Sequence, residues 1–302
     1  MIASVVVDTG PLHPGHHSLQ IYCPYPLVAD IPWILRRQKA STLRCMQLVR
    51  DTIETRKRHI QETGRPPRDD ILQRFIDARD PETGQKLTPA QLEAEIKLML
   101  LSGSDTTGNM LSFAIMNLMH CPECYKRVTE EVRSTFPDSS QLISFADANS
   151  KLPYLSAVIH ESMRLNPSFA SVLQRCVPAE VSPSRTASFQ AVQMSLWANP
   201  GMFDPERFLG PDSANRLRDI LTFSSGARLC PGRHLAMLEI YTVLANIVRK
   251  YDFSLPNDAP YGPHRVNMDG IPVEVPAETF GVTGPKNPSD NCWVNISLAE
   301  TA

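Results

Sequence analysis

The longest helical stretch, residues 89–120, constrains the fold more than any other part of this 302-residue chain. Its N-terminus is well marked, because Thr88 suits the N-cap, Pro89 suits the first helical position and Gln91 completes a capping box. The stretch is apolar on most sides rather than along one stripe. A helix of this kind is buried by its neighbours on several sides. We therefore expect a fold in which residues 89–120 form a central helix.

The middle of this helix breaks the apolar pattern. Residues 102–109 read Ser-Gly-Ser-Asp-Thr-Thr-Gly-Asn, which puts eight small or polar residues inside it. Each glycine costs roughly 1 kcal/mol relative to alanine in a helix, and a buried Asp105 carboxylate would need partners. Local rules broken in mid-helix often mark a functional site, so we expect one here.

Periodic apolar residues predict five further helices. They cover residues 32–62, 70–78, 122–136, 150–165 and 232–251. The 26 prolines gather instead in the first 70 residues, in 178–211 and in 256–288. We therefore predict irregular structure over 1–30 and 254–302, with one strand at Ile271–Val275. The expected fold class is mainly α with minor β.

Composition excludes several classes of protein. The formal net charge is −2, so no general basic field favours nucleic acid as a partner. Seven cysteines, an odd and modest number, argue for reduced thiols rather than a secreted disulfide framework. The N-terminus lacks the basic region of a signal peptide, and no run of about 18 apolar residues occurs. We expect no transmembrane segment in this chain.

The most specific string is Phe-Ser-Ser-Gly-Ala-Arg-Leu-Cys-Pro-Gly at residues 223–232, directly before a strong helix. The free N–H groups and dipole of a helix N-terminus favour a thiolate at Cys230. The glycines allow tight turns and close backbone approach. This arrangement suits a thiolate held beneath a flat partner, with Arg228 nearby for anionic groups. The alternative is a buried structural cysteine before a helix.

The string resembles the haem-binding signature of the cytochrome P-450 superfamily, Phe-x-x-Gly-x-Arg-x-Cys-x-Gly. All five specified positions match, at Phe223, Gly226, Arg228, Cys230 and Gly232. A chance match anywhere in such a chain is on the order of 1 in 10,000 or rarer. The resemblance implies haem b (iron-protoporphyrin IX) as cofactor. It makes Cys230 the axial iron ligand and pairs Arg228 with a haem propionate.

Two further family motifs follow the expected order. Glu161 and Arg164 match Glu-x-x-Arg, whose spacing places both charges on one helix face. Arg207 lies in Pro-Glu-Arg-Phe, residues 205–208. In the family the two arginines enclose the glutamate in an internal cluster. Such a cluster costs desolvation, so we interpret it as specifying the fold near the haem rather than adding stability.

The polar segment at 102–107 resembles the family's oxygen-binding helix, which opens slightly beside the haem. By that resemblance Asp105 relays protons, and Thr106 hydrogen-bonds the iron-bound peroxide and steers it toward O–O scission. Ser102 stands where the family usually has a small apolar residue. The alternative for this segment is a helix kink without chemistry.

The resemblance implies a haem-thiolate monooxygenase. It would insert one oxygen atom from O₂ into a small apolar molecule, with electrons relayed from NADPH by a flavoprotein reductase. We expect one incomplete haem-thiolate domain over 1–302, with a family-like core at 31–253 that corresponds to the C-terminal part of the fold. By this resemblance we expect most of the family's N-terminal half to be missing from the sequence. A truncated, non-catalytic fragment that binds at most haem or a partner is therefore the alternative.

Softer features suggest fungal members of the benzoate-hydroxylase and pisatin-demethylase type, in secondary metabolism. The resemblance implies the endoplasmic reticulum membrane, on its cytosolic face, and a cytoplasmic location if the chain is complete as given.

Cys121 and Cys124 have the spacing of a redox motif or of half a zinc site. No second pair of cysteines or histidines lies at zinc-finger distance. We expect both thiols to be reduced at a helix start, with a thiol-redox or zinc protein as a third hypothesis.

Overall fold

The structure is a computed structural model of the whole chain. It describes residues 6–7, 21–22, 36–138, 140–169, 197–268, 272–273, 275–280 and 282–299. The chain groups into two compact units, residues 1–102 and 103–302, and the boundary falls within one long helix. We expected a single domain over 1–302, and that stays a prediction.

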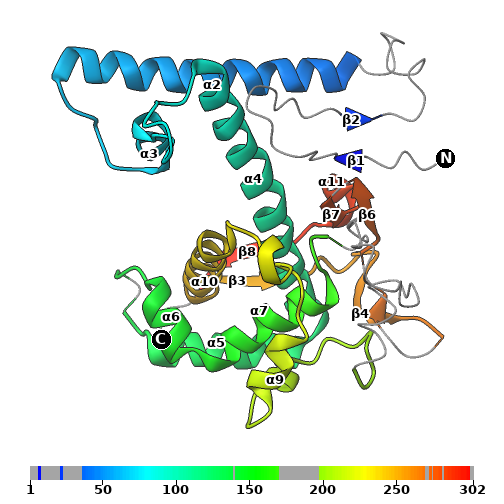
Figure 1. Cartoon of the computed structure of the whole chain (residues 1–302). Helices are drawn as coiled ribbons and strands as arrows, with labels where there is room; N and C mark the ends of the chain where they lie inside the picture. The colour runs from blue at the N-terminus through cyan, green and yellow to red at the C-terminus, as the bar shows by residue number, and fades with distance from the viewer. Residues whose placement is uncertain are drawn as a thin grey trace, which may run out of the picture. The chain divides into compact units, whose positions relative to one another are not determined.

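The first unit contains helices α2 (Arg36–Thr63) and α3 (Ile71–Asp77) and the start of α4 (Pro89–His120) (Figure 1). A two-residue strand pair, β1 (Val6–Val7) and β2 (Ile21–Tyr22), precedes them. The helices share a small core of buried aliphatic side chains: Val49, Ile53, Leu92 and Ile96. The Asp70 carboxylate caps α3 through the Gln73 N–H and pairs with the buried Arg56 at 2.6 Å. That pairing holds the pKa of Asp70 well below its usual range.

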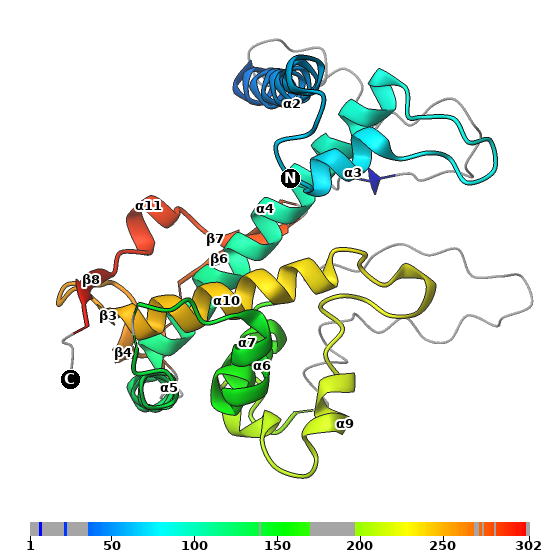
Figure 2. The ribbon, with the colours of Figure 1, turned by 90° about the vertical axis from the view of Figure 1, so that its left-hand side faces the viewer.

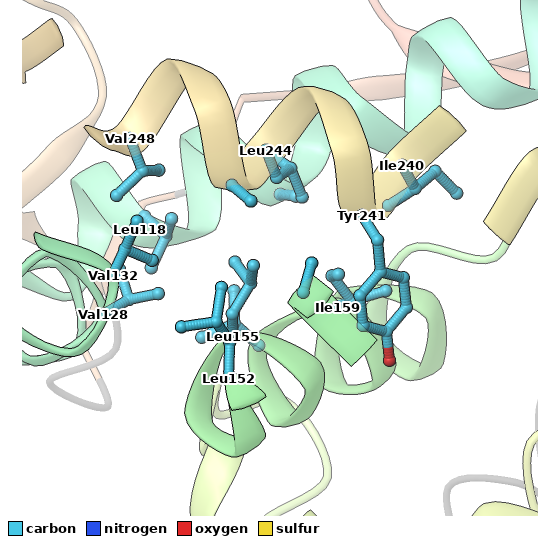
Figure 3. Close-up of a cluster of buried hydrophobic side chains, with 14 of the residues drawn as sticks. Leu118, Val128, Val132, Leu152, Leu155, Ile159, Ile240, Tyr241, Leu244 and Val248 are labelled. Carbon is cyan, nitrogen blue, oxygen red and sulfur yellow. The ribbon is translucent and has the colours of Figure 1, made fainter. Parts of the chain in front are cut away.

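The second unit is a helical bundle around one larger core. It comprises the rest of α4 and helices α5 (Pro122–Thr135), α6 (Phe145–Lys151), α7 (Pro153–Leu165), α9 (Ser213–Arg218) and α10 (Arg233–Lys250). α10 runs across α6 and α7 (Figure 2). Leu118 of α4, Val128 and Val132 of α5, Leu155 and Ile159 of α7 and Leu244 of α10 meet in its core (Figure 3). Because α4 and α10 share this core, the elements that carry the predicted site are packed into one body.

The predicted start of the helix over residues 150–165 is wrong. The structure has two helices, α6 and α7, separated by Leu152. Pro153 lacks the N–H that would continue α6, and a residue before proline is driven out of the helical region. Leu152 accordingly adopts φ −119° and ψ 70°. Ser144 caps α6 by accepting a hydrogen bond from the Asp147 N–H.

The irregular tail predicted over 254–302 is wrong in part, because this segment contains several strands. The strand predicted at Ile271–Val275 is present at Pro272–Val273, while residues 271 and 274 lie outside the described residues. Three antiparallel pairs form: β3 (Tyr251–Ser254) with β8 (Asn295–Leu298), β4 (Gly262–Val266) with β5 (Pro272–Val273), and β6 (Ala277–Phe280) with β7 (Val282–Pro285). A short helix, α11 (Pro288–Asn291), precedes β8. β3 depends on a distant partner, since Tyr251 pairs with Leu298, so its local sequence carries little signal, whereas β4–β5 and β6–β7 pair segments that are close in the chain.

The fold is mainly α with minor β, as predicted from the sequence. Within the described ranges, no helix has both the length and the hydrophobicity to cross a membrane.

Candidate functional site

The loop before α10 is held in shape by its own backbone. The N–H of Cys230 donates to the carbonyl of Phe223 at 2.9 Å, which closes residues 223–230. A short 3₁₀ turn, η2 (Gly226–Arg228), lies inside the loop. Gly226 has φ +63°, a left-handed conformation that favours glycine. The loop therefore needs glycine at the second specified position of the signature.

Cys230 presents a free, part-exposed thiol directly before α10. Gly232 is the N-cap of α10, so the thiol lies at the N-terminal end of this helix. A Cβ atom at Gly232 would stand 3.8 Å from the Cys230 Sγ, and one at Gly226 would meet nothing within 4 Å. The two glycines thus leave both the sulfur and the loop backbone uncovered.

The side chains around Cys230 divide by polarity and burial. Phe223 packs against the main core, and the Arg233 guanidinium lies 6.0 Å from the centre of its ring. Arg228 and Leu229 are exposed. One glycine-bounded loop thus carries a soft sulfur donor, an exposed guanidinium and an exposed apolar side chain. These groups suit the iron, the propionates and the apolar face of a haem.

The polar segment of α4 remains helical at every residue, so the opening implied by the family resemblance is not seen as a break. Asp105 is exposed and Thr106 half-buried, while the next residue, Thr107, is buried. The Thr106 carbonyl accepts a hydrogen bond from the Ser168 hydroxyl at 3.3 Å. The two predicted proton-handling residues therefore lie on an intact helix with differing exposure.

A contact missed at the sequence level anchors the β6–β7 hairpin to α4. The Asn109 side chain donates to the Thr283 carbonyl at 3.1 Å, and the Thr283 N–H donates to the Ser168 carbonyl at 2.7 Å. A Cβ at Gly284 would lie 2.8 Å from the Asn109 amide nitrogen, so a larger residue there would displace the Asn109 side chain. In the sequence, Asn109 was marked only by its position at the end of the polar segment. Nothing in the sequence marked Ser168 or Thr283 as functional.

The structure brings together the three residues of the predicted charge cluster. Glu161 is fully buried, and Arg164 binds it through two hydrogen bonds of 2.6 and 2.8 Å. Arg207 reaches the same carboxylate at 3.3 Å, and the Asp204 N–H donates to it at 2.8 Å. The buried charge of Glu161 is thus compensated on all sides.

The arginines of this cluster also hold the loop that follows residue 196. Arg164 donates to the carbonyls of Pro200 and Met202, and Arg207 donates to those of Ala198 and Asn199. The cluster therefore joins α7 to the turn η1 (Pro205–Phe208) and to the chain before it.

His160 lies next to Glu161 in α7 and is half-buried. Its Nδ1 donates to the Ser156 carbonyl at 2.7 Å. Burial lowers the pKa of His160, and the nearby charge of Arg233 adds to this lowering. The ring packs beside Phe208 at 5.9 Å between centroids. The imidazole is therefore a neutral packing group near the cluster.

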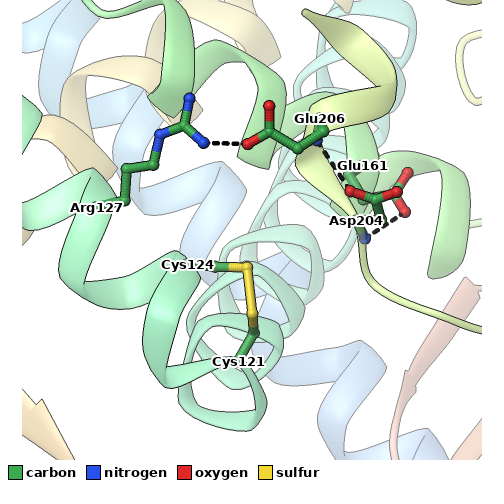
Figure 4. Close-up of a disulfide and its surroundings, with 6 residues drawn as sticks. All are labelled: Cys121, Cys124, Arg127, Glu161, Asp204 and Glu206. Carbon is green, nitrogen blue, oxygen red and sulfur yellow. Dashed lines mark hydrogen bonds and ion pairs between the residues drawn. A yellow bond between two sulfur atoms is a disulfide. The ribbon is translucent and has the colours of Figure 1, made fainter.

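The reduced thiols predicted at Cys121 and Cys124 are a wrong prediction, because the structure joins them in a disulfide (Figure 4). Cys121 precedes α5 and Cys124 lies in its first turn, which brings their Cα atoms to 5.2 Å. That distance lies in the usual range for a disulfide. A zinc site on the pair lacks support, since among the described residues no three His, Cys, Asp or Glu side chains converge on one point.

Comparison with known proteins agrees with this geometry. The family model described as cytochrome P-450 matches residues 14–183 and 188–268. Two cytochrome P-450 monooxygenases of Aspergillus fumigatus, helB1 and helB2, are each 34% identical to the chain, over 94% and 89% of its length. The alignments cover 50% and 54% of those relatives, so the chain spans about half their length.

Solved structures show the same fold. A cytochrome P-450 crystal structure (CYP102L1) superposes with a TM-score of 0.67 at 22% identity, covering 90% of this chain and 59% of that one. The haem domain of cytochrome P-450DA gives 0.68 at 19% identity, covering 91% and 58%. A benzoate-hydroxylase-like subtype stays a prediction. The chain belongs to the cytochrome P-450 family.

Proposed function

We propose that this chain is the haem-thiolate part of a monooxygenase that inserts one oxygen atom from O₂ into a small apolar substrate. The observation that carries the proposal is the free Cys230 thiol on a closed, glycine-bounded loop at the start of α10. When bound, haem supplies the iron that activates O₂ and receives electron density from the Cys230 thiolate. NADPH is the electron source, through a flavoprotein reductase, as is general in the family.

Each residue of the loop has its own role in binding haem. Cys230 supplies the sulfur ligand, and Arg228 neutralises a propionate. Gly226 and Gly232 would leave the loop backbone open to the macrocycle, while Phe223 anchors the loop to the core. The short loop with its internal hydrogen bond fixes the sulfur before haem arrives.

Two residues of α4 handle protons in this proposal. Asp105, exposed on the helix, exchanges protons with solvent. Thr106, half-buried, would hold a proton on its hydroxyl and donate it to the bound oxygen. The bond from Ser168 to the Thr106 carbonyl limits movement of this turn. Glu161, Arg164 and Arg207 act as a structural cluster and contact no reacting atom.

The location proposed from family membership is the cytosolic face of the endoplasmic reticulum.

The first experiment tests whether Cys230 is the ligand of the haem iron. The full chain is loaded with haem, reduced and exposed to CO, and the Soret band is recorded. Wild type and the control Cys292→Ser, which removes another free thiol, should show the red-shifted band of the family. Cys230→Ser should lose it. A Cys230→Ser protein with an unchanged band would refute the proposed ligand.

A turnover test separates the enzyme from the alternative, a haem-binding fragment without activity. The haem-loaded chain is mixed with a flavoprotein reductase, NADPH and an apolar probe. Oxygenated product formed in step with NADPH oxidation supports the monooxygenase. A normal CO spectrum without product supports the fragment.

A further inference from the structure

The Cys121–Cys124 disulfide lies in the wall of a cavity, and its two cysteines differ in exposure. Cys121, ahead of α5, is part-exposed, while Cys124 in the first turn is only 8% exposed. Both line a cavity of about 600 Å³, together with Tyr154, Arg127 and the segment around Pro205. Cavities of this size accept small organic ligands.

The disulfide contributes little as a brace for the fold. It closes a loop of only three residues' separation, and the chain entropy that a disulfide removes falls with loop length. α5 is already fixed by Val128 and Val132, which are fully buried, and by Arg133, which donates to the carbonyls of Val248 and Tyr251. Breaking the bond should therefore leave α5 in place.

The cavity wall carries charges of both signs. Lys126 and Arg127 lie on α5, and Glu123 and Glu130 on the same helix. Arg127 pairs with Glu206 of η1, which also lines the cavity (Figure 4). A zwitterionic thiol of tripeptide size, with carboxylates and an ammonium group, matches this lining in both size and charge.

We propose that Cys121 and Cys124 form a reversible dithiol–disulfide couple that exchanges electrons with a small zwitterionic thiol such as glutathione. This inference is independent of the monooxygenase function. The sulfur of Cys121, the more exposed of the two cysteines, is the one attacked, and the Cys121–Cys124 bond breaks as a mixed disulfide forms on Cys121. Cys124 leaves as a thiolate in the first turn of α5, where free N–H groups and the helix dipole favour an anion.

The exchange is balanced in atoms and electrons. A second small thiol attacks the mixed disulfide and releases Cys121. In total, two small thiols become one small disulfide, and two electrons and two protons convert the protein disulfide into two thiols. The small disulfide drives the reverse reaction.

The test follows the two cysteines in the full chain. The protein is equilibrated without air in glutathione buffers of graded thiol-to-disulfide ratio, quenched with acid and alkylated. Mass spectrometry then counts alkyl groups on the peptide that contains residues 121–124, and circular dichroism verifies that the chain stays folded. We expect both cysteines to become alkylated together as the ratio rises, with the same transition in the control Cys292→Ser.

The variant Cys124→Ser identifies the attacked sulfur. It should accumulate glutathione on Cys121, because the resolving thiol is missing. The proposal is overturned if the disulfide is unchanged over the whole series or if the two cysteines are alkylated independently of each other. It is also overturned if glutathione is found on Cys124 in the matched variant Cys121→Ser but not on Cys121 in Cys124→Ser.

Discussion

The Glu161 cluster and the Cys230 loop are both built from family motifs, yet their surroundings are opposite. In the cluster, every charged group is buried or nearly so and bonded to another part of the chain. In the loop, the backbone is bonded internally while Arg228, Leu229 and part of Cys230 face outward. Residues that specify the fold satisfy one another, whereas residues suited to an external group are left available on a fixed backbone.

The largest effect should come from Glu161→Gln. Arg164, with a side chain 3% exposed, would keep its charge in a buried site without a counter-charge. Removing one partner of a buried pair costs about 3–5 kcal/mol. Urea denaturation of the haem-free chain measures this loss. The matched control is Glu206→Gln, whose 53% exposed carboxylate pairs with Arg127 and should cost about 0–1 kcal/mol. Equal losses would contradict the contrast between the two environments.

A smaller loss is expected from Gly226→Ala in the cysteine loop. A non-glycine residue in the left-handed region costs roughly 1–2 kcal/mol, and Gly226 has φ +63°. The control is Gly103→Ala in α4, where a Cβ meets nothing within 4 Å and alanine favours the helix. Thermal melting of both variants should lower the midpoint for Gly226→Ala only. A drop of the same size at Gly103 would mean that backbone conformation is not the cause.

The third expected effect is a dependence of folding stability on pH. Burial lowers the pKa of His160 in the folded chain, so below its unfolded value of about 6.5 the unfolded chain binds more protons. Folding stability should therefore fall as pH drops from 7 toward 5. His160→Gln removes this contribution, so its urea midpoint should change less over the same range. His120, whose pKa burial also lowers, adds a slope of the same sign that both proteins share. An identical pH slope in the two proteins would disprove the role of His160.

The smallest effect on stability should come from Cys230→Ser. Its thiol is part-exposed, and substitutions at such positions usually change stability by no more than about 0.5 kcal/mol. Urea denaturation without haem measures this. A loss above about 2 kcal/mol would show that Cys230 is a structural residue, which would erase the contrast with Glu161.

The candidate site was largely predictable because its residues lie in short, local motifs. Glu161 and Arg164 are three residues apart on one helix, so the spacing alone places them on one face. Arg207 comes from a loop 46 residues away, and the structure does bring it to the same carboxylate. The anchoring of the β6–β7 hairpin was not predictable, because the Asn109 to Thr283 bond joins residues 174 positions apart.

The errors have equally local causes. The predicted helix over 150–165 overlooked that Pro153 ends one helix and begins another. The predicted reduced state of Cys121 and Cys124 followed from the overall cysteine count, whereas their pairing depends only on the first turn of α5.

The sequence by itself determined the long central helix, the family, and the loop that presents Cys230, because each depends on residues close together in the chain. Only the tertiary structure decided the pairing of β3 with β8, the burial of Glu161 and the bond from Asn109 to Thr283. Pairing and desolvation depend on which surfaces meet when the chain folds, and a local pattern does not encode that.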